Sequence, residues 1–290
     1  MTEFVQTIAN GLTLGTLYSL VALGLTLIYG VMHLSNFAQG EFAMIGGFAA
    51  YYLVNQGFSY AAAVILAFGI AGLIGLLVHL LAYHPLRKSD HINMMLSSLG
   101  VSLFLINLAQ YFFSPNPKVV ESPLSGHSLQ MFGIFVSHQR ILIVIVSVLL
   151  CGLTYALLEY TRFGRSVRAI SLDPDTATLY GIATKKISFL TFMLGVALTG
   201  VAGALLTPVY NVYPTIGISL TLKAFVVVVL GGMGNVKGAI AGGIIVGLIE
   251  SLTGGYISTA FQDAIVFGVL FLVLVFKPQG ILTKVQGEKV

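Results

Sequence analysis

Apolar runs of similar length, divided by short polar segments, account for most of this sequence of 290 residues. Most runs are close to the roughly 20 residues with which an α-helix crosses a bilayer, and they lack the alternation of a strand. We therefore predict an all-α polytopic membrane protein, a bundle of about 8–9 transmembrane helices in a single transmembrane domain over residues 1–290. The runs lie at about 12–31, 37–54, 60–82, 93–113, 140–159, 188–208, 219–232, 238–254 and 261–276.

Two of these runs differ from complete crossings. The run at 37–54 follows VMHLSNFAQGE, residues 31–41, which contains no Lys or Arg to mark a loop. The run at 219–232 has only about 14 residues, and it follows TPVYNVYPTIG, residues 207–217, with its prolines and glycine. Both patterns predict interrupted or re-entrant helices.

The composition supports a membrane protein. Charged residues make up only 8% of the chain, and the mean hydropathy is +0.96. A soluble domain carries roughly 25% charged residues, so this chain cannot cover its surface against water. The net charge of +4 comes from basic residues between the runs, which indicates membrane orientation rather than nucleic-acid binding. Cys151 is the single cysteine, which excludes an intrachain disulfide, and in its apolar run we expect it to pack.

Basic residues also predict which side each connection faces. The 83–92 turn, the 160–187 segment and the tail after 276 contain several Lys or Arg, so we place them in the cytoplasm. The 114–139 segment has one Lys against one Glu, and we place it outside. The side of the N-terminus stays open.

Small residues recur four positions apart in several runs. Such rows let helix backbones approach closely in lipid, so they predict a tightly packed bundle and a partner subunit. The rows are Gly11, Gly15 and Ser19; Gly195, Thr199 and Gly203; Gly238 and Gly242; and Gly243, Gly247, Ser251 and Gly255.

The stretch RAISLDPDTATLYGI, residues 168–182, is polar where its surroundings are apolar. Asp173 is a favourable N-cap, Pro174 is a favourable first helical residue, and Gly181 suits the position after the last turn. The pattern predicts a short helix at 174–180. It belongs either to an ordinary solvated loop or to a docking element for a soluble partner. The connection is about 28 residues long, although a few residues can join two helices of a bundle, and this extra length favours the docking element over the ordinary loop.

Motifs for nucleotide, metal or covalent chemistry are absent from the sequence. No GxxxxGK[ST] phosphate-binding loop occurs, and GGMGNVKG at 231–238 has the wrong spacing. The six His are scattered, and no nucleophile–base pair is suggested. We therefore expect no catalytic residue, metal or cofactor in this chain. If ATP drives the protein, another chain binds the ATP.

Four motifs together resemble one family. They are NGLTLGTLYSLVALGLTLIYGVMHLSNFAQGEFAMIGGF at 10–48, GRSVRAISLDPDTATLYGI at 164–182, KAFVVVVLGGMGNVKGAIAGGIIVGLIES at 223–251 and KPQGIL at 277–282. In this order they are similar to the permease subunits of bacterial branched-chain amino acid ABC transporters. The chain most resembles the H-type subunit of the leucine/isoleucine/valine system, and the resemblance covers essentially its whole length.

The resemblance implies a multi-pass permease of the bacterial inner membrane that works within a complex. Two permease subunits, usually one H-type and one M-type, form the pathway. Two soluble ATPases bind beneath them, and an extracytoplasmic binding protein delivers the amino acid. The resemblance also makes 160–187 the cytoplasmic loop that couples permease to ATPase. The residues carried over to it, with Pro174 added for its place in the helix, are Arg168, Ala169, Asp173, Pro174, Ala177 and Gly181.

A pathway for leucine needs a weakly apolar lining with a few hydrogen-bonding groups, because leucine joins an apolar side chain to a zwitterion. Transporters often build such places from interrupted helices. The two interruptions offer His33, Ser35, Asn36, Gln39 and Glu41, and Asn211, Tyr213 and Thr215.

Several of these polar residues also have a structural interpretation. A carboxylate within the membrane usually faces a cavity or a partner, but Glu41 can equally be paired structurally or lie near a membrane surface. Asn36 can cap a helix that starts at Phe37. Lys223 and Glu250 are explained at least as well by pairing or snorkelling.

Other functions stay open from the residues alone. A permease of the same class can carry urea, a short amide or another amino acid. A proton-coupled secondary transporter can use Glu41 or Glu250, although it has no need of a docking helix. A membrane enzyme is disfavoured, because no catalytic cluster is present.

Overall fold

The structure is a computed structural model that describes residues 2–86, 89–120, 122, 124, 128–131, 134–277 and 279–281. Its elements, in chain order, are α1 (Thr2–Met32), α2 (Gln39–Asn55), α3 (Tyr60–Val78), the π-helical turn η1 (His79–Tyr83), α4 (His91–Phe113), β1 (Ser128–Met131), β2 (Ile134–Ser137), α5 (His138–Tyr160), α6 (Arg162–Leu172), α7 (Pro174–Leu179), α8 (Thr184–Leu206), α9 (Ile216–Gly231), α10 (Val236–Tyr256), the 3-10 turn η2 (Thr259–Phe261) and α11 (Gln262–Phe276).

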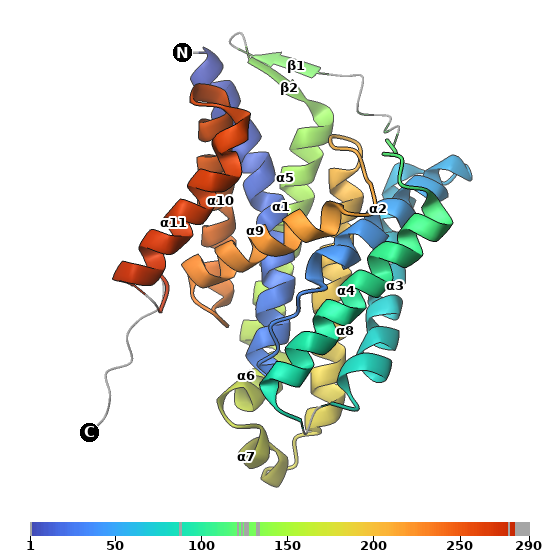
Figure 1. Cartoon of the computed structure of the whole chain (residues 1–290), viewed down its shortest axis with the longest axis vertical. Helices are drawn as coiled ribbons and strands as arrows, with labels where there is room; N and C mark the ends of the chain where they lie inside the picture. Colours follow the sequence, from blue (N-terminus) through green and yellow to red (C-terminus); the bar gives the residue numbers. More distant parts are fainter. Residues whose placement is uncertain are drawn as a thin grey trace.

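Each predicted apolar run forms a helix, so the all-α membrane bundle is confirmed. Within the described residues, seven helices are long and apolar enough to cross a membrane, and α9 is a shorter apolar helix. The two runs predicted to be interrupted are α2 and α9, with 17 and 16 residues. In Figure 1, α2 begins in the middle of the bundle and α9 slants across its face.

Two further elements lie in segments that the apolar pattern assigned to loops. The 114–139 segment contains the antiparallel hairpin β1–β2. The 160–187 segment contains α6 as well as α7, and α6 buries Gly164, Val167 and Ile170 at intervals of three residues. That spacing is a helical signal, but it extends over too few residues to stand out in a polar segment.

The two ends of the bundle carry different structures (Figure 1). The N-terminus and the β1–β2 hairpin lie at one end, where Gln6 Oε1 accepts a hydrogen bond from the Phe135 amide at 3.1 Å. The helices α6 and α7 lie at the other end. We call these the hairpin end and the α7 end. Several charges that oriented the connections lie outside the described residues, namely Arg87, Lys88, Glu121, Lys284 and Lys289.

The fold repeats itself with the chain direction inverted. Both α1–α4 and α8–α11 consist of a long helix, a break, a short helix and two further helices, and α1 and α8 run in opposite directions (Figure 1). α1 packs chiefly on α10, and α8 packs on α3 in the corresponding way. The halves meet where Gly24 crosses Gly195, because a Cβ on either glycine would meet the carbonyl oxygen of the other. Repeats of this kind bring the broken helices to the interface between the halves.

The rows of small residues form these helix contacts. A Cβ on Gly15 would come within 2.8 Å of the Ile244 Cα, so α1 and α10 touch backbone to backbone. Ser19, in the same row, donates a hydrogen bond to the Ile240 carbonyl at 2.8 Å. The other rows also face segments of this chain. The rows therefore explain packing within the chain, and they give no evidence for the partner subunit that we expected from them.

Candidate functional site

Asp173 caps α7, the second helix of a two-helix unit at the α7 end (Figure 1). Its Oδ1 accepts hydrogen bonds from the amides of Asp175 and Thr176, at 3.0 and 3.2 Å. The Thr176 hydroxyl donates to the other carboxylate oxygen, and these hydrogen bonds hold the pKa of Asp173 below its usual range. The cap is therefore charged at neutral pH, where it stabilises the positive end of the helix.

The boundaries of α7 agree with the prediction from sequence. The helix spans Pro174–Leu179, against the predicted 174–180. Gly181 follows it with a φ of +82°, in which a side chain would be strained. Ala177 is only 4% exposed and packs inward, and Ala169 on α6 is half-buried. These two alanines attach the unit to the bundle and leave the other side of α7 free.

Exposed apolar side chains at the ends of α6 and α7 were not among the candidates from sequence. Leu172, Leu179 and Tyr180 are 87%, 87% and 83% exposed. We call these three residues the apolar tip. Large apolar side chains exposed together on a short polar element are typical of a contact with another protein.

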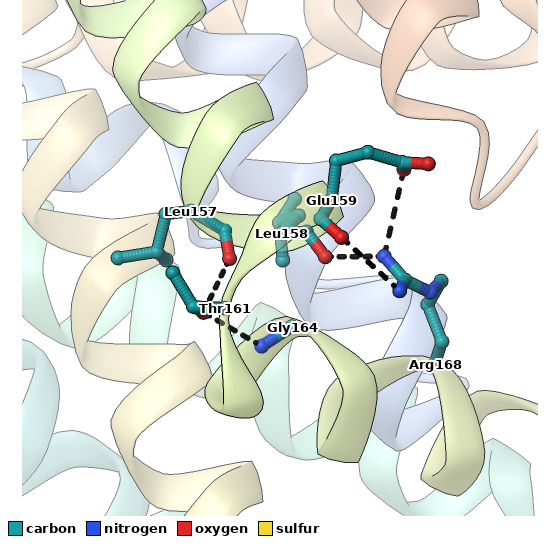
Figure 2. A network of polar contacts seen from close by, with 6 residues as sticks. All are labelled: Leu157, Leu158, Glu159, Thr161, Gly164 and Arg168. Atoms are coloured by element: carbon teal, nitrogen blue, oxygen red, sulfur yellow. Dashed lines mark hydrogen bonds and ion pairs between the residues drawn. The ribbon is translucent and has the colours of Figure 1, made fainter.

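Hydrogen bonds join α6 to the C-terminal end of the long helix α5, at the corner where the chain turns from one helix into the other (Figure 2). The Arg168 guanidinium donates to the Leu158 carbonyl and, at 3.4 Å, to the Glu159 carbonyl. Its ion pair with the Glu159 carboxylate, at 3.5 Å, is half-exposed and contributes little by itself. Thr161 caps α6 by accepting a hydrogen bond from the Gly164 amide at 3.2 Å. Because α6 satisfies the last carbonyls of α5, the two helices are held as one rigid corner.

Asn36 and Gln39 hold the break between α1 and α2 together, and both are fully buried. Asn36 Oδ1 accepts hydrogen bonds from the Tyr83 hydroxyl at 2.9 Å and from the Ala38 amide at 3.2 Å, and its Nδ2 donates to Gln39. Gln39 Nε2 donates to the Thr199 hydroxyl at 2.6 Å. Asn36 thus caps the turn that leads into α2, which begins two residues later than the sequence suggested.

Glu41 lies at the contact between the two halves of the fold. It is fully buried within the protein, and its Oε1 accepts a hydrogen bond from the Ser102 hydroxyl at 3.0 Å. Its Oε2 lies against the backbone of Gly217 and has no hydrogen-bond partner among the described residues. Glu41 therefore joins α2, α4 and α9.

Three other candidates make none of the hydrogen bonds of Asn36, Gln39 and Glu41 described above. The backbone carbonyl of Ser35 accepts a hydrogen bond from the Ser98 hydroxyl at 3.4 Å. His33 and Asn211 are exposed, and His33 has a positive φ of 50° in the turn after α1.

Tyr213 and Thr215 line a pocket of about 330 Å³ between α9 and α11, which we call the α9–α11 pocket. Lys223 on its wall lies 2.6 Å from Glu250, so the pairing suggested by the sequence is confirmed. Asp263, which sequence reasoning missed, lies 3.3 Å from the same Lys223 nitrogen. The complete lining is Tyr213, Thr215, Ile218, Ser219, Leu222, Lys223, Asp263 and Phe267.

Comparison with known proteins places this chain in a family. Residues 7–274 match the family described as "Branched-chain amino acid transport system / permease component". The chain is 36% identical to the high-affinity branched-chain amino acid transport system permease protein LivH of Salmonella typhimurium, over 99% of this chain and 98% of that protein. With the same coverage, it is 35% identical to the corresponding permease protein BraD of Pseudomonas aeruginosa. A probable branched-chain amino acid transport permease protein of Methanocaldococcus jannaschii is 31% identical, over 93% of this chain and 89% of that protein.

We expect Asn36→Ala to lower the free energy of unfolding by about 2–4 kcal/mol, because it leaves several buried hydrogen-bonding groups unpaired. Asn107→Ala is the matched control, since Asn107 is exposed and its side-chain amide donates a hydrogen bond to the Leu103 carbonyl of its own helix. Thermal unfolding of the purified protein in detergent, followed by circular dichroism, measures both variants. Normal stability of Asn36→Ala together with lost transport would instead assign Asn36 to the pathway.

Proposed function

Because this chain belongs to the permease family of branched-chain amino acid transport systems, we propose that it is a permease subunit of an ATP-driven importer of leucine, isoleucine and valine. It is a multi-pass protein of the inner membrane. The observation that carries the proposal is the α6–α7 unit, a capped and exposed helix pair fixed to α5. Soluble ATPases need such a lever to act on a membrane domain, and a secondary transporter has no use for one.

In this function the chain acts with several partners. Two soluble ATPases bind the α7 end and hold the ATP, so this chain needs no cofactor and no catalytic residue. A second permease subunit, of the M type, completes the pathway. An extracytoplasmic binding protein delivers the amino acid at the hairpin end. The chain itself is one permease domain over residues 1–290, with 160–187 as its coupling segment.

Basic side chains favour an orientation with the α7 end in the cytoplasm. Arg162, Arg165, Lys185 and Lys186 are all exposed near this end. Connections on the cytoplasmic side carry an excess of Lys and Arg. The N-terminus and the hairpin, at the opposite end of the bundle, then lie outside.

Movement of α7 can reach the centre of the bundle through existing contacts. The apolar tip receives the motion of the ATPases, and Arg168 passes it from α6 to the end of α5. Both α5 and α6 pack on α1, and α6 also packs on α8. Because α1 and α8 cross at Gly24 and Gly195, a shift of one half displaces the other. ATP binding would thus switch the side to which the pathway opens.

The structure disfavours a proton-coupled carrier. Glu250 is paired with Lys223 at 2.6 Å, and Glu41 accepts a hydrogen bond from Ser102, so both carboxylates have structural partners that account for them without proton coupling. Import of urea, a short amide or another amino acid would use the same architecture. The relatives named above are branched-chain amino acid permeases, which favours leucine and its analogues as the solute.

Uptake of labelled leucine tests the proposed function directly. We expect uptake to require this chain and to survive an uncoupler that collapses the proton gradient while ATP is maintained. Loss of uptake with the gradient, at constant ATP, would point to a secondary carrier. Chain-dependent uptake of another small solute but not leucine would change the substrate and keep the mechanism.

Arg168→Ala tests the corner between α5 and α6. We expect leucine import to fall by about three- to thirtyfold, because the motion of α7 no longer reaches α5, while the ATPases still co-purify with the permease. Arg165→Ala, on the same helix and exposed, is the control that should import normally. Equal import by the two variants would remove Arg168 from the coupling route.

Leu179→Ser tests the apolar tip as the docking surface. Loss of an exposed apolar anchor should weaken binding of the ATPases by about tenfold. Thr178→Ser, at the neighbouring exposed position, is the control with little change in apolar surface. The measurement is co-purification of the ATPases with the tagged permease over a range of ATPase concentrations. Wild-type binding by Leu179→Ser would place the docking surface elsewhere.

A further inference from the structure

The α9–α11 pocket brings together more charge than pairing alone explains. Lys223 lies 2.6 Å from Glu250 and 3.3 Å from Asp263, so one cation meets two carboxylates. Lys223 and Glu250 lie within apolar helices, where a charge is costly and usually faces a pathway or a partner. Asp263 lies in the first turn of α11, where the helix N-terminus favours a carboxylate. Glu250 alone would neutralise Lys223, so Asp263 adds a carboxylate that the lysine does not need.

The two carboxylates have different environments. The side chains of Lys223 and Glu250 are 12% and 7% exposed, whereas that of Asp263 is 64% exposed. Tyr18 also fixes Lys223, with its hydroxyl 3.3 Å from the lysine nitrogen and its ring beneath it. Lys223 and Glu250 therefore form a fixed and buried pair. Asp263 is the partner that can leave Lys223 at small cost, because exposed ion pairs are weak.

The first half of the fold holds its buried charge in a different way. Glu41 on α2 is fully buried, its Oε1 accepts a hydrogen bond from the Ser102 hydroxyl on α4, and it forms no ion pair among the described residues. The second half instead places one cation between two carboxylates, on α9, α10 and α11. This second arrangement presents both signs of charge to a ligand.

The remainder of the pocket has a polar part and an apolar part. Hydroxyl groups come from Tyr213, Thr215 and Ser219, and apolar surface comes from Ile218, Leu222 and Phe267. Its volume of about 330 Å³ is near the lower limit for small-molecule pockets, so it suits a ligand of few atoms. A small molecule with adjacent positive and negative groups and an apolar side chain matches this lining.

We propose that the α9–α11 pocket is a transit site for the zwitterion of an aliphatic amino acid. Asp263 turns from Lys223 to the α-ammonium group, and the α-carboxylate takes its place on the Lys223 nitrogen. The aliphatic side chain lies against Ile218 and Leu222. Each charge keeps an opposite partner, and the net charge of the pocket is unchanged because the zwitterion is neutral. This inference rests on the proposed function and names the place where its substrate passes.

The exposure of Asp263 also sets the expected strength of binding. Water weakens the attraction between Asp263 and the ammonium group in the same way as it weakens the Lys223–Asp263 pair. Sites along a conducting pathway need such weak binding, because the solute has to leave again.

The test is leucine import by the complete transporter in proteoliposomes, with its ATPases and leucine-loaded binding protein. Asp263→Asn keeps the shape of the side chain and removes the charge that receives the ammonium group, so we expect import to fall by about three- to tenfold. Asp90→Asn, the same change at an exposed residue directly before α4, is the control and should import at the wild-type rate. Wild-type import by Asp263→Asn would overturn the transit site alone. Failure of the wild type to import leucine would overturn the proposed function and this inference with it.

A second measurement reports occupancy of the pocket without transport. Cys151 is the single cysteine, so Ser219→Cys in a Cys151→Ser background places one thiol in the pocket. In the assembled transporter without ATP, millimolar leucine should slow modification of this thiol by a methanethiosulfonate reagent. Asp263→Asn should abolish the protection, and 4-methylpentanoate, which lacks the ammonium group, should protect less than leucine. Equal rates with and without leucine would overturn the proposal.

Discussion

Backbone groups at the break between α1 and α2 must find hydrogen-bond partners inside the protein, because hydrocarbon offers none. The chain meets this constraint with buried side chains: Asn36 accepts from the Ala38 amide, and Thr221 of α9 accepts from the Gly40 amide at 2.8 Å. The second bond requires α2 and α9 to approach closely, and Gly40 against Gly217 permits it, since a Cβ on Gly40 would meet the Gly217 carbonyl oxygen. The contact between the halves therefore depends on polar residues and glycines together, and the crossing of the long helices is built around it.

The inverted repeat separates what the fold needs from what transport needs. Features shared by both halves, such as the reciprocal crossing at Gly24 and Gly195, belong to the architecture. Features present in one half only are candidates for function. The charges at Lys223 and Asp263 fall in the second class, because Glu41, the buried charge of the first half, accepts a hydrogen bond from Ser102 and forms no ion pair among the described residues. The α6–α7 unit also lies outside the repeat, between its two halves, where it contacts α5 and α8.

Mechanical coupling between a soluble partner and a membrane bundle needs a stiff connection and an accessible surface. In this chain the stiffness comes from Arg168, which satisfies the final carbonyls of α5, and from the capped start of α7 at Asp173. The accessible surface is the apolar tip, whose exposure to water is unfavourable unless a partner covers it. Ala177 faces the opposite way and joins the unit to the bundle. In the docking role proposed for this segment, some residues fix it to the bundle and others are exposed and can bind the ATPases.

The sequence by itself determined the features that depend on neighbouring residues. The apolar runs located the long helices and both interrupted ones, and Asp173 and Gly181 located α7, because hydrophobic length and helix capping are local properties. Only the tertiary structure decided which polar residues work together. Asn36 and Glu41 are pathway candidates from sequence, and the tertiary structure shows which buried hydrogen bonds they make, while Asp263 was overlooked until α11 brought it to Lys223. The role of a polar side chain in a membrane bundle depends on the partner that neutralises it, and that partner lies on another helix.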